Sequence, residues 1–498
     1  MKRQNVLRTV AAIVLGISFI LPVAACNKDK AATPTSVTVG ITQEPGLFDP
    51  HLAVAAGDKE ILFNIFEGLY KFSSDGTLNP ALATGCSVSD DCKEFTFDLR
   101  KDVKFHDGSV MTADDVVYSI ERAKENIQTL GTISGIEKIS EEQVKITLSI
   151  ANSEFLSQAT FAIIPKSVSD INANPVGTGP FKFKEYLPGQ SVTIIKNEDY
   201  WNDSVPYLDE VVFKICADMD SGLLELQNGS IDIFPHMTKD KAEMAGDNFN
   251  MVTGSSNMIQ IFALNNAVEP FNNVKVREAL NYAVNKDDII DLTMDGAGTK
   301  LTTGMNPVIG KAYDTSLDST YSLDLEKAKS LLKEAGYENG FDMTITVPSN
   351  YLVHVNTAEV IADQLKEIGI NAEIEQIDWS TWLSDVYAGR DYQSTVICLT
   401  PIYAPMDEIA RYHSESTDNF INYKNPEVDR IIDSIPTTLD ESERIDLYHQ
   451  LLGILVADNC SVYIQDPMEI TVVKKDIEGY KLYPMYIQDM SEVKYKES

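Results

Sequence analysis

Apolar and polar positions alternate most regularly in the middle of the chain, where the period changes between that of a strand and that of a helix. Strand patterns occupy residues 343–347, 371–377 and 394–399. A helical stripe runs from Asn356, which can cap a helix, to Gly369, and a shorter one covers 380–389. Strands and helices that alternate with short connections predict a parallel, doubly wound α/β unit.

The carboxyl ends of these strands predict the position of a cleft. Ligands of doubly wound sheets bind beyond these ends, which here are the segments 348–351, 378–382 and 400–407. We expect the following residues of these segments to line a ligand site: Asn350, Tyr351, Trp379, Thr400, Tyr403 and Asp407. Aromatic faces bind sugars, apolar groups or peptide side chains, and the alternative for Trp379 and Trp382 is packing in the core.

The rest of the chain mixes strands with amphipathic helices. Strand patterns lie at 37–41, 95–99, 143–150, 191–196, 210–215 and 461–465. Helical patterns begin at a capping box, Thr112 to Asp115, and cover 274–284, 324–335 and 441–456. The chain has 498 residues, enough for about three domains or large subdomains.

The charge of the chain excludes one large class of partner. Lys and Arg number 41 and Asp and Glu 75, so the formal net charge is −34. Such a surface repels phosphate backbones, and we expect no nucleic acid partner. A high net charge keeps a protein soluble, and we expect a monomer.

The N-terminus has the pattern of an export signal. Residues 1–25 combine a basic start, an apolar run too short to span a membrane, and the small residues Ala24 and Ala25. Val23 to Cys26 resembles the lipobox of bacterial lipoproteins, which implies a diacylated Cys26 and a flexible tether over 26–36. We therefore expect the protein on the outer face of the cytoplasmic membrane, at the cell surface or in the periplasm, anchored by lipid only. The alternative is a secreted protein with a chance cysteine after an ordinary cleavage site.

The remaining cysteines do not form a disulfide framework, because five is an odd number. Cys86 and Cys92 flank a short loop, and we consider a disulfide between them in an oxidising compartment. Cys216, Cys398 and Cys460 lie in apolar runs typical of buried strands. No CxxC, HExxH or HxH spacing occurs, so no transition-metal site is predicted.

Enzyme signatures are also absent. The chain has no GxSxG turn, and residues 304–311 have one residue too many for a phosphate loop. Gly177-Thr178-Gly179 is followed by Pro180 and lacks the third glycine of a dinucleotide-binding turn. We expect neither catalysis nor a cofactor.

Several longer stretches are too specific to be generic. They are FTFDLRKDVKFHDGSVMTADDVV at 95–117, GTGPFKFKEY at 177–186, NEDYW at 197–201, PFNNVKVREALNYAVNK at 270–286, AKSLLKEAGY at 328–337 and NYKNPEVDRII at 422–432. In this order they resemble the family 5 solute-binding proteins, which include oligopeptide- and dipeptide-binding lipoproteins of ATP-binding-cassette (ABC) importers. The resemblance runs from about Val37 to the C-terminus.

The resemblance implies a bilobed α/β fold of the periplasmic-binding-protein type. Lobe I comprises residues 37–262, with an extra subdomain within about 70–190, and receives a C-terminal return at 466–498. Lobe II comprises 266–460. The crossings, at Ile259 to Asn265 and Ser461 to Gln465, are strand-like and pair as a hinge.

The same resemblance implies that the lobes close on a ligand and deliver it to a permease with ATPase partners. Peptide is the family's commonest ligand, yet the aspartate that holds a peptide's amino group in the family aligns with Pro401 here. The loop 348–351 also lacks the arginine with which dipeptide binders hold the ligand carboxylate. Glu44, Asp407 or Glu408 is a candidate substitute for the missing aspartate. The alternatives are a glycan fragment, opine, metal chelate or apolar compound in the same fold, or a receptor for a signalling peptide.

Overall fold

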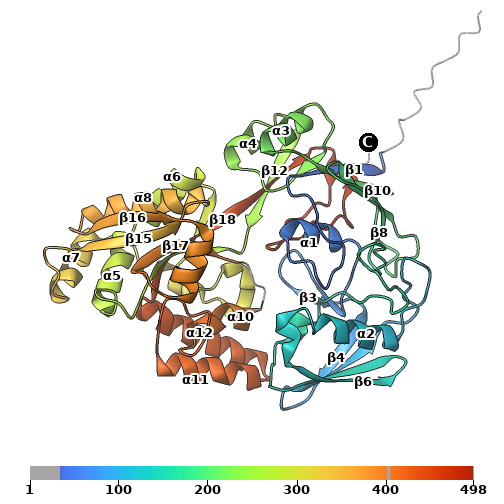
Figure 1. Ribbon diagram of the computed structural model, residues 1–498, viewed down its shortest axis with the longest axis horizontal. Helices are drawn as coiled ribbons and strands as arrows, with labels where there is room; N and C mark the ends of the chain where they lie inside the picture. Colours follow the sequence, from blue (N-terminus) through green and yellow to red (C-terminus); the bar gives the residue numbers. More distant parts are fainter. Residues whose placement is uncertain (1–33, 401–403, 497–498) are drawn as a thin grey trace, which may run out of the picture.

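A computed structural model describes residues 34–400 and 404–496, and Figure 1 shows two lobes that lie side by side. Within these ranges, one mixed sheet of twelve strands extends through both lobes, in the order β16-β15-β17-β13-β18-β11-β1-β10-β9-β8, with β12 and β14 pairing to β18. Cys26 and the predicted signal and tether up to residue 33 fall outside the described residues, as do Pro401 and Tyr403. The predicted bilobed α/β fold is confirmed.

Lobe I contains one half of the large sheet and a separate antiparallel sheet. The first comprises β1 (Ser36–Ile41), β8 (Phe181–Leu187), β9 (Ser191–Lys196), β10 (Glu210–Ile215) and β11 (Ile233–Phe234), with α1 (Ala56–Leu62), α3 (Met219–Gln227), α4 (Lys239–Glu243) and β12 (Phe249–Ser255) nearby. The second is ordered β4 (Ala83–Val88), β5 (Glu94–Leu99), β7 (Gln143–Leu148) and β6 (Ile133–Ser140). Helix α2 (Ala113–Ala123) begins at the predicted capping box and packs its fully buried side chains Val116, Ile120 and Ala123 into the same core.

Lobe II contains the predicted doubly wound unit. Its strands are β13 (Ile259–Leu264), β14 (Gly298–Lys300), β15 (Asp342–Pro348), β16 (Asn371–Ile377) and β17 (Ser394–Leu399). Its main helices are α5 (Val274–Ala283), α6 (Lys286–Met294), α7 (Leu325–Glu334), α8 (Leu352–Lys366), α9 (Trp379–Thr381), α10 (Pro405–Ile409), α11 (Pro426–Ser434) and α12 (Glu441–Ala457). Strand β15 pairs in parallel with both β16 and β17, which confirms the predicted parallel unit.

Two connecting segments, residues 255–258 and about 466–467, join the lobes, and we call them the hinge. Strand β13 pairs with β17 on one side and with the first part of β18 (Ser461–Lys474) on the other, so the two segments predicted as crossings pair with each other, but they do so within the sheet of lobe II. Further along, β18 pairs with β12, from Ser255 opposite Met468 onwards. Because β13 is paired within the sheet of lobe II, the chain passes between the lobes at residues 255–258 and at about 466–467.

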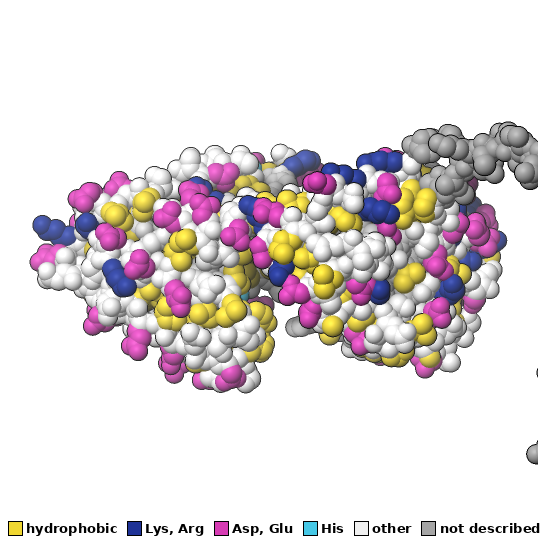
Figure 2. All heavy atoms as spheres, turned by 90° about the horizontal axis from the view of Figure 1, so that it is seen from above, with side chains coloured by type: hydrophobic (Ala, Val, Ile, Leu, Met, Phe, Trp, Pro, Cys, Tyr) yellow, Lys and Arg dark blue, Asp and Glu magenta, His cyan; other side chains and the backbone are white. Residues whose placement is uncertain are grey.

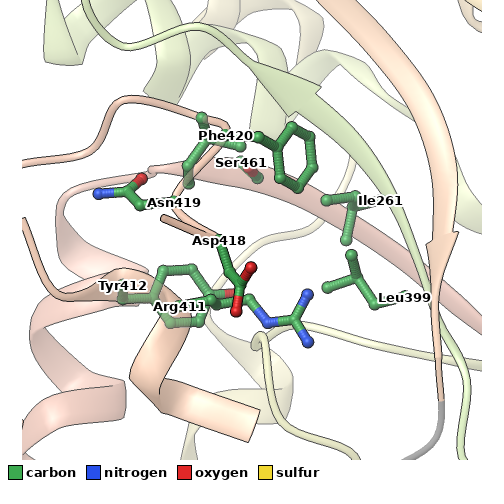
Figure 3. Close-up of a pocket in the computed structure, with 9 residues that line it drawn as sticks. Ile261, Leu399, Arg411, Tyr412, Asp418, Asn419, Phe420 and Ser461 are labelled. Carbon is green, nitrogen blue, oxygen red and sulfur yellow. The ribbon is translucent and has the colours of Figure 1, made fainter. Parts of the chain in front are cut away.

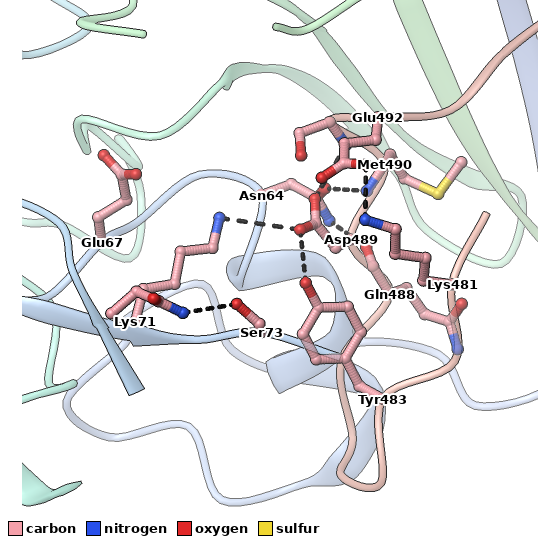
Figure 4. A network of polar contacts seen from close by, with 12 residues as sticks. Asn64, Glu67, Lys71, Ser73, Lys481, Tyr483, Gln488, Asp489, Met490 and Glu492 are labelled. Carbon is pink, nitrogen blue, oxygen red and sulfur yellow. Dashed lines mark hydrogen bonds and ion pairs between the residues drawn. The ribbon is translucent and has the colours of Figure 1, made fainter. Parts of the chain in front are cut away.

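The C-terminal segment returns to lobe I. The Asn64 side chain donates a hydrogen bond to the carbonyl of Gln488 at 2.7 Å and accepts one from the N–H of Met490 at 2.9 Å (Figure 4). Between them, Asp489 accepts a hydrogen bond from the Tyr483 hydroxyl and lies 3.9 Å from the Lys71 ammonium. These contacts fix residues 483–490 on the lobe I side of the hinge.

The motifs at 177–186 and 197–201 pack into the interior of lobe I. Gly177 and Gly179 lie so close to the backbone of residues 64–65 that a Cβ atom at either position would collide with it. The buried Glu67 carboxylate accepts hydrogen bonds from Thr178, Tyr200 and Trp201. Burial raises the pKa of Glu67, against the lowering effect of Lys71 and these donors. These two motifs of lobe I therefore supply close packing and buried hydrogen bonds.

The disulfide considered for Cys86 and Cys92 is wrong, because both are free thiols in the structure. Cys86 lies inside the β4–β5 ladder opposite Phe97, where burial raises the pKa of its thiol to about 12. Cys92 follows the turn with a left-handed φ of 54°, and its side chain is fully buried. The ladder and the turn thus place the two side chains in separate environments.

Candidate ligand-binding cleft

Two aromatic side chains of lobe II are open to solvent where β15 and β16 end. The rings of Tyr351 and Trp379 meet edge to face with centroids 5.3 Å apart, and they are 41% and 36% exposed. Trp379 stacks on Trp382 at 5.1 Å with an interplanar angle of 4°. Trp382 is 3% exposed and donates its indole N–H to the Thr395 hydroxyl, so it belongs to the core. The pair Tyr351 and Trp379 forms an aromatic platform.

Local capping positions this platform. The Asp378 carboxylate accepts hydrogen bonds from the backbone N–H groups of Ser380 and Thr381, which starts the helical turn at Trp379. Tyr351 is the N-cap residue of α8, five residues before Asn356, the predicted cap of that helix. The helix extends over Val355 and Ala358 because both are buried on the same stripe as Ile361.

The other predicted site residues are more scattered. Asn350 and Thr400 are exposed at the ends of β15 and β17. Asp407, in the first turn of α10, is half-buried, and burial raises the pKa of its carboxyl group. Glu44 accepts hydrogen bonds from the Tyr186 hydroxyl and the Gly189 N–H at 2.6 Å each, so its two partners both belong to lobe I. These bonds lower the pKa of Glu44.

The facing wall, on lobe I, has a charged cluster that the sequence analysis missed. His236 lies between two carboxylates, with Nε2 2.5 Å from Glu60 and Nδ1 2.9 Å from Glu469. Desolvation lowers the pKa of His236, but the bonds to Glu469 and Glu60 outweigh it and raise the pKa to about 11.

A pocket opens beside this cluster, next to the hinge. Its lining includes His236, Glu469, Ser256, Met258 and Tyr486. Burial raises the pKa of Tyr486, and smaller contributions come from Glu60 and Glu469 on lobe I and from Cys398 and Tyr351 on lobe II. Tyr486 therefore lines this pocket together with His236 and Glu469.

A smaller pocket lies within lobe II, and Figure 3 shows Arg411 and Asp418 beside it. Its lining includes Ile261 and Leu399. Glu408 is 1% exposed, lies 3.8 Å from the Arg411 guanidinium, and has no hydrogen-bond partner for either carboxylate oxygen within the described chain. Burial raises the pKa of Glu408 to about 7. Glu408 is thus a buried group.

The whole arrangement consists of two walls, a hinge and a hollow between them. Figure 2 shows this hollow between the lobes, with acidic side chains spread over the outer surface of both. In residues 34–400 and 404–496, no group of three or more His, Cys, Asp or Glu side chains is placed to hold a metal ion. No helix in those ranges combines the length and apolarity needed to cross a bilayer.

A comparison with protein families decides the class. Residues 77–420 match the model of the bacterial extracellular solute-binding proteins, family 5. The chain belongs to this family. Its members are extracytoplasmic solute-binding proteins and not enzymes. The resemblance inferred from the six motifs is confirmed.

Individual relatives match over nearly the whole length. The chain is 26% identical over 534 residues to the oligopeptide-binding protein AppA of Bacillus subtilis, covering 97% of each chain. The structure of the ABC transporter substrate-binding protein CtaP from Listeria monocytogenes superposes with a TM-score of 0.82 at 27% identity, covering 93% of this chain and 100% of that one. The periplasmic binding protein DppA of Helicobacter pylori, in complex with the peptide STSA, gives 0.73 at 25% identity and covers 93% and 99%.

Proposed function

We propose that this solute-binding protein captures peptides by closing its two lobes and delivers them to the permease and ATPase of an ABC importer. The observation that carries this proposal is the platform of Tyr351 and Trp379, which stays exposed at the ends of β15 and β16 in lobe II. The relative AppA is named for oligopeptide binding, and DppA was solved with a peptide. Hinge closure would bury the platform on the ligand and shift an open–closed equilibrium.

The ligand contacts that we propose combine this platform with the polar strand ends. They are Glu44, Asn350, Tyr351, Trp379, Thr400, Tyr403 and Asp407. Of the three acids considered as substitutes for the missing aspartate, Glu408 is buried and Glu44 already has two partners, so Asp407 is the substitute to test if a peptide's amino group proves to be anchored. A half-buried carboxylate with a raised pKa gains a partner when an ammonium group binds.

A peptide screen tests this function directly. We expect di-, tri- and longer peptides to raise the melting temperature of the mature protein, by an amount equivalent to about 2.7 kcal/mol at one hundred times the dissociation constant. Oligosaccharides, opines and metal chelates are tested in the same screen as the alternative ligand classes. If only one of those classes stabilises the protein, the peptide assignment is wrong although the solute-binding role stands.

N-acetylated peptides then test the anchor. A charge-assisted hydrogen bond to a buried ammonium contributes roughly 1.5–3 kcal/mol, so an aspartate-anchored binder loses about tenfold to a hundredfold on acetylation. With Pro401 at the usual aspartate position, we expect a loss below about fivefold by calorimetry. A loss of a hundredfold would show that another acid does this work, and Asp407→Asn would then identify it.

We further propose that the mature protein is a monomeric lipoprotein without catalytic activity, anchored at Cys26. The export signal, the lipobox and the polar tether follow one another in the sequence, in the order that a lipoprotein requires. Cys26→Ser should release the protein from membranes, and labelling with a radioactive fatty acid should mark only the wild type. Membrane association that persists without label would contradict the lipid anchor.

A further inference from the structure

The two lobes touch a second time, away from the hinge. The loop that follows β7 in lobe I reaches the turn between α11 and α12 in lobe II, a region seen at the lower centre of Figure 1. There the Ser153 N–H donates a hydrogen bond to the carbonyl of Pro436 at 2.9 Å. The Ser153 hydroxyl donates another to the carbonyl of Ile435 at 3.1 Å. Two carbonyls of lobe II are thus satisfied by one residue of lobe I.

The next residue adds a charged contact. The Glu154 carboxylate accepts a hydrogen bond from the Met406 N–H at 3.2 Å and lies 3.7 Å from the Arg444 Nε. The side chains of Glu154 and Arg444 are each only 15% exposed. Burial raises the pKa of Glu154, and the charge of nearby Asp407 raises it further. Tyr448, the Met406 N–H and Arg444 lower this pKa, but by less than burial and Asp407 together raise it. A carboxylate of lobe I is therefore desolvated against lobe II.

The loop is held in shape by its own lobe. The Asn152 N–H donates to the carbonyl of Cys92 at 3.0 Å, and the Asn152 side chain accepts from the Glu154 N–H at 3.0 Å. Because the loop is preorganised, the contact with lobe II does not require ordering of a flexible segment. Loss of one partner of the pair formed by Glu154 and Arg444 would leave an uncompensated, partly buried charge.

This contact exists while the cleft is open. In the same arrangement of the lobes, Tyr351 and Trp379 remain 41% and 36% exposed on their wall. We propose that Ser153 and Glu154, with Met406, Ile435, Pro436 and Arg444, form a latch that stabilises the open arrangement and opposes closure on the ligand. This inference rests on the proposed closure of the lobes and identifies what sets its equilibrium.

The latch has a quantitative consequence for affinity. A ligand that binds a closed arrangement has an apparent affinity reduced by the fraction of molecules able to close. Removing the latch raises that fraction, so affinity should increase. The contacts of Glu154 are partly exposed to solvent, so we count their loss as that of one ordinary hydrogen bond and expect an increase of about threefold to tenfold.

The first test needs no ligand. Spin labels introduced as non-natural amino acids at Glu141 on lobe I and Asp433 on lobe II, whose side chains are 75% and 73% exposed, report the distance between the lobes. We expect Glu154→Ala and Arg444→Met to broaden the distance distribution of the full mature chain, and the double variant to add little. Glu326→Ala, at a 90% exposed glutamate of α7, is the matched control. An unchanged distribution in Glu154→Ala would overturn the latch.

The second test uses any peptide that stabilises the protein in the screen. We expect Glu154→Ala, and to a smaller degree Glu154→Gln and Ser153→Ala, to bind this peptide about threefold to tenfold more tightly than wild type. Equal or weaker binding by all three variants would overturn the proposal. Thermal unfolding of each variant shows whether it folds. If Glu154→Ala does not fold, the peptide affinity of the milder variant Glu154→Gln tests the latch instead. If no peptide binds, the proposed function fails, and the distance measurement still decides the latch.

Discussion

The Asp466 carboxylate accepts a hydrogen bond from the Ser256 hydroxyl at 2.7 Å and thereby joins the two segments of the hinge. The same carboxylate accepts hydrogen bonds from the Ser255 hydroxyl and, at 3.1 Å, from the Met258 N–H. Burial raises the pKa of Asp466, against the lowering effect of these donors. One side chain on β18 therefore fixes the position of the neighbouring crossing.

Asp466→Ala should destabilise the protein and loosen the hinge. The substitution leaves a backbone N–H and two hydroxyls without their acceptor in a buried site, at a cost of roughly 2–3 kcal/mol in the free energy of unfolding. Denaturant unfolding measures this loss. Asp203→Ala, at an exposed aspartate of lobe I, should change stability by less than about 0.5 kcal/mol. Equal effects of the two substitutions would contradict the joining role of Asp466.

Glu408 gives a prediction about pH. Its pKa rises from 4.5 to about 7 in the folded protein, so between these values the folded state keeps a proton that the unfolded state releases. The stability that Glu408 contributes is full below pH 4.5 and is lost as the pH rises through about 7. Glu408→Gln remains neutral, so at pH 8 it should be more stable than wild type by about 1–3 kcal/mol.

The comparison at two pH values provides the control for Glu408. At pH 4.5 the wild-type carboxyl is mostly protonated in the folded state, and the two proteins should unfold at nearly the same temperature. The competing possibility is that the ion pair with Arg411, 3.8 Å away, outweighs desolvation. In that case Glu408→Gln would be less stable than wild type at pH 8.

His106 should make stability fall with acid. Its Nε2 donates to the carbonyl of Gly179 at 3.0 Å, and its Nδ1 accepts from the Gly177 N–H, so the folded state requires the neutral ring. Desolvation lowers the pKa of His106 from 6.5 to about 4. The unfolded state therefore binds more protons between these values, and the contribution of His106 is full above pH 6.5 and lost as the pH falls toward 4.

His106→Gln isolates this effect. The variant should be less stable than wild type at pH 7.5, and the difference should shrink by about 1.4 kcal/mol for each pH unit within the titration window. Chemical unfolding at pH 7.5, 6 and 5 gives the three differences. A difference that is constant over this range would show that the ring does not titrate between the two states.

The elements of lobe II could be predicted from sequence because each signal is local. The strands at 371–377 and 394–399 have the predicted bounds, and the helix at 324–335 has its predicted Asp324 cap. The disulfide failed for the same reason, since the spacing of Cys86 and Cys92 does not tell which face of the hairpin each thiol occupies. Local pattern predicts elements and does not place side chains around them.

The lobe I wall could not be predicted, because its members come from distant parts of the chain. Glu60, His236 and Glu469 are separated by more than 170 residues at each step, yet both ring nitrogens of His236 have a carboxylate partner. His236 also has a left-handed φ of 59°, which no local motif indicates. The contact of Ser153 with Pro436 is likewise visible only once both lobes are folded.

The two stacked tryptophans should separate ligand binding from stability. Trp382 is 3% exposed, and Trp382→Ala should cost about 3–5 kcal/mol because it leaves a cavity in the core of lobe II. Trp379 is 36% exposed, so Trp379→Ala should cost about 1 kcal/mol or less in stability. Because Trp379 belongs to the platform, the same substitution should weaken peptide binding by at least about tenfold. Leu383→Ala, at a 40% exposed residue of the same segment, is the control for binding. If Trp379→Ala bound peptide as tightly as Leu383→Ala, the aromatic platform would not be part of the ligand site.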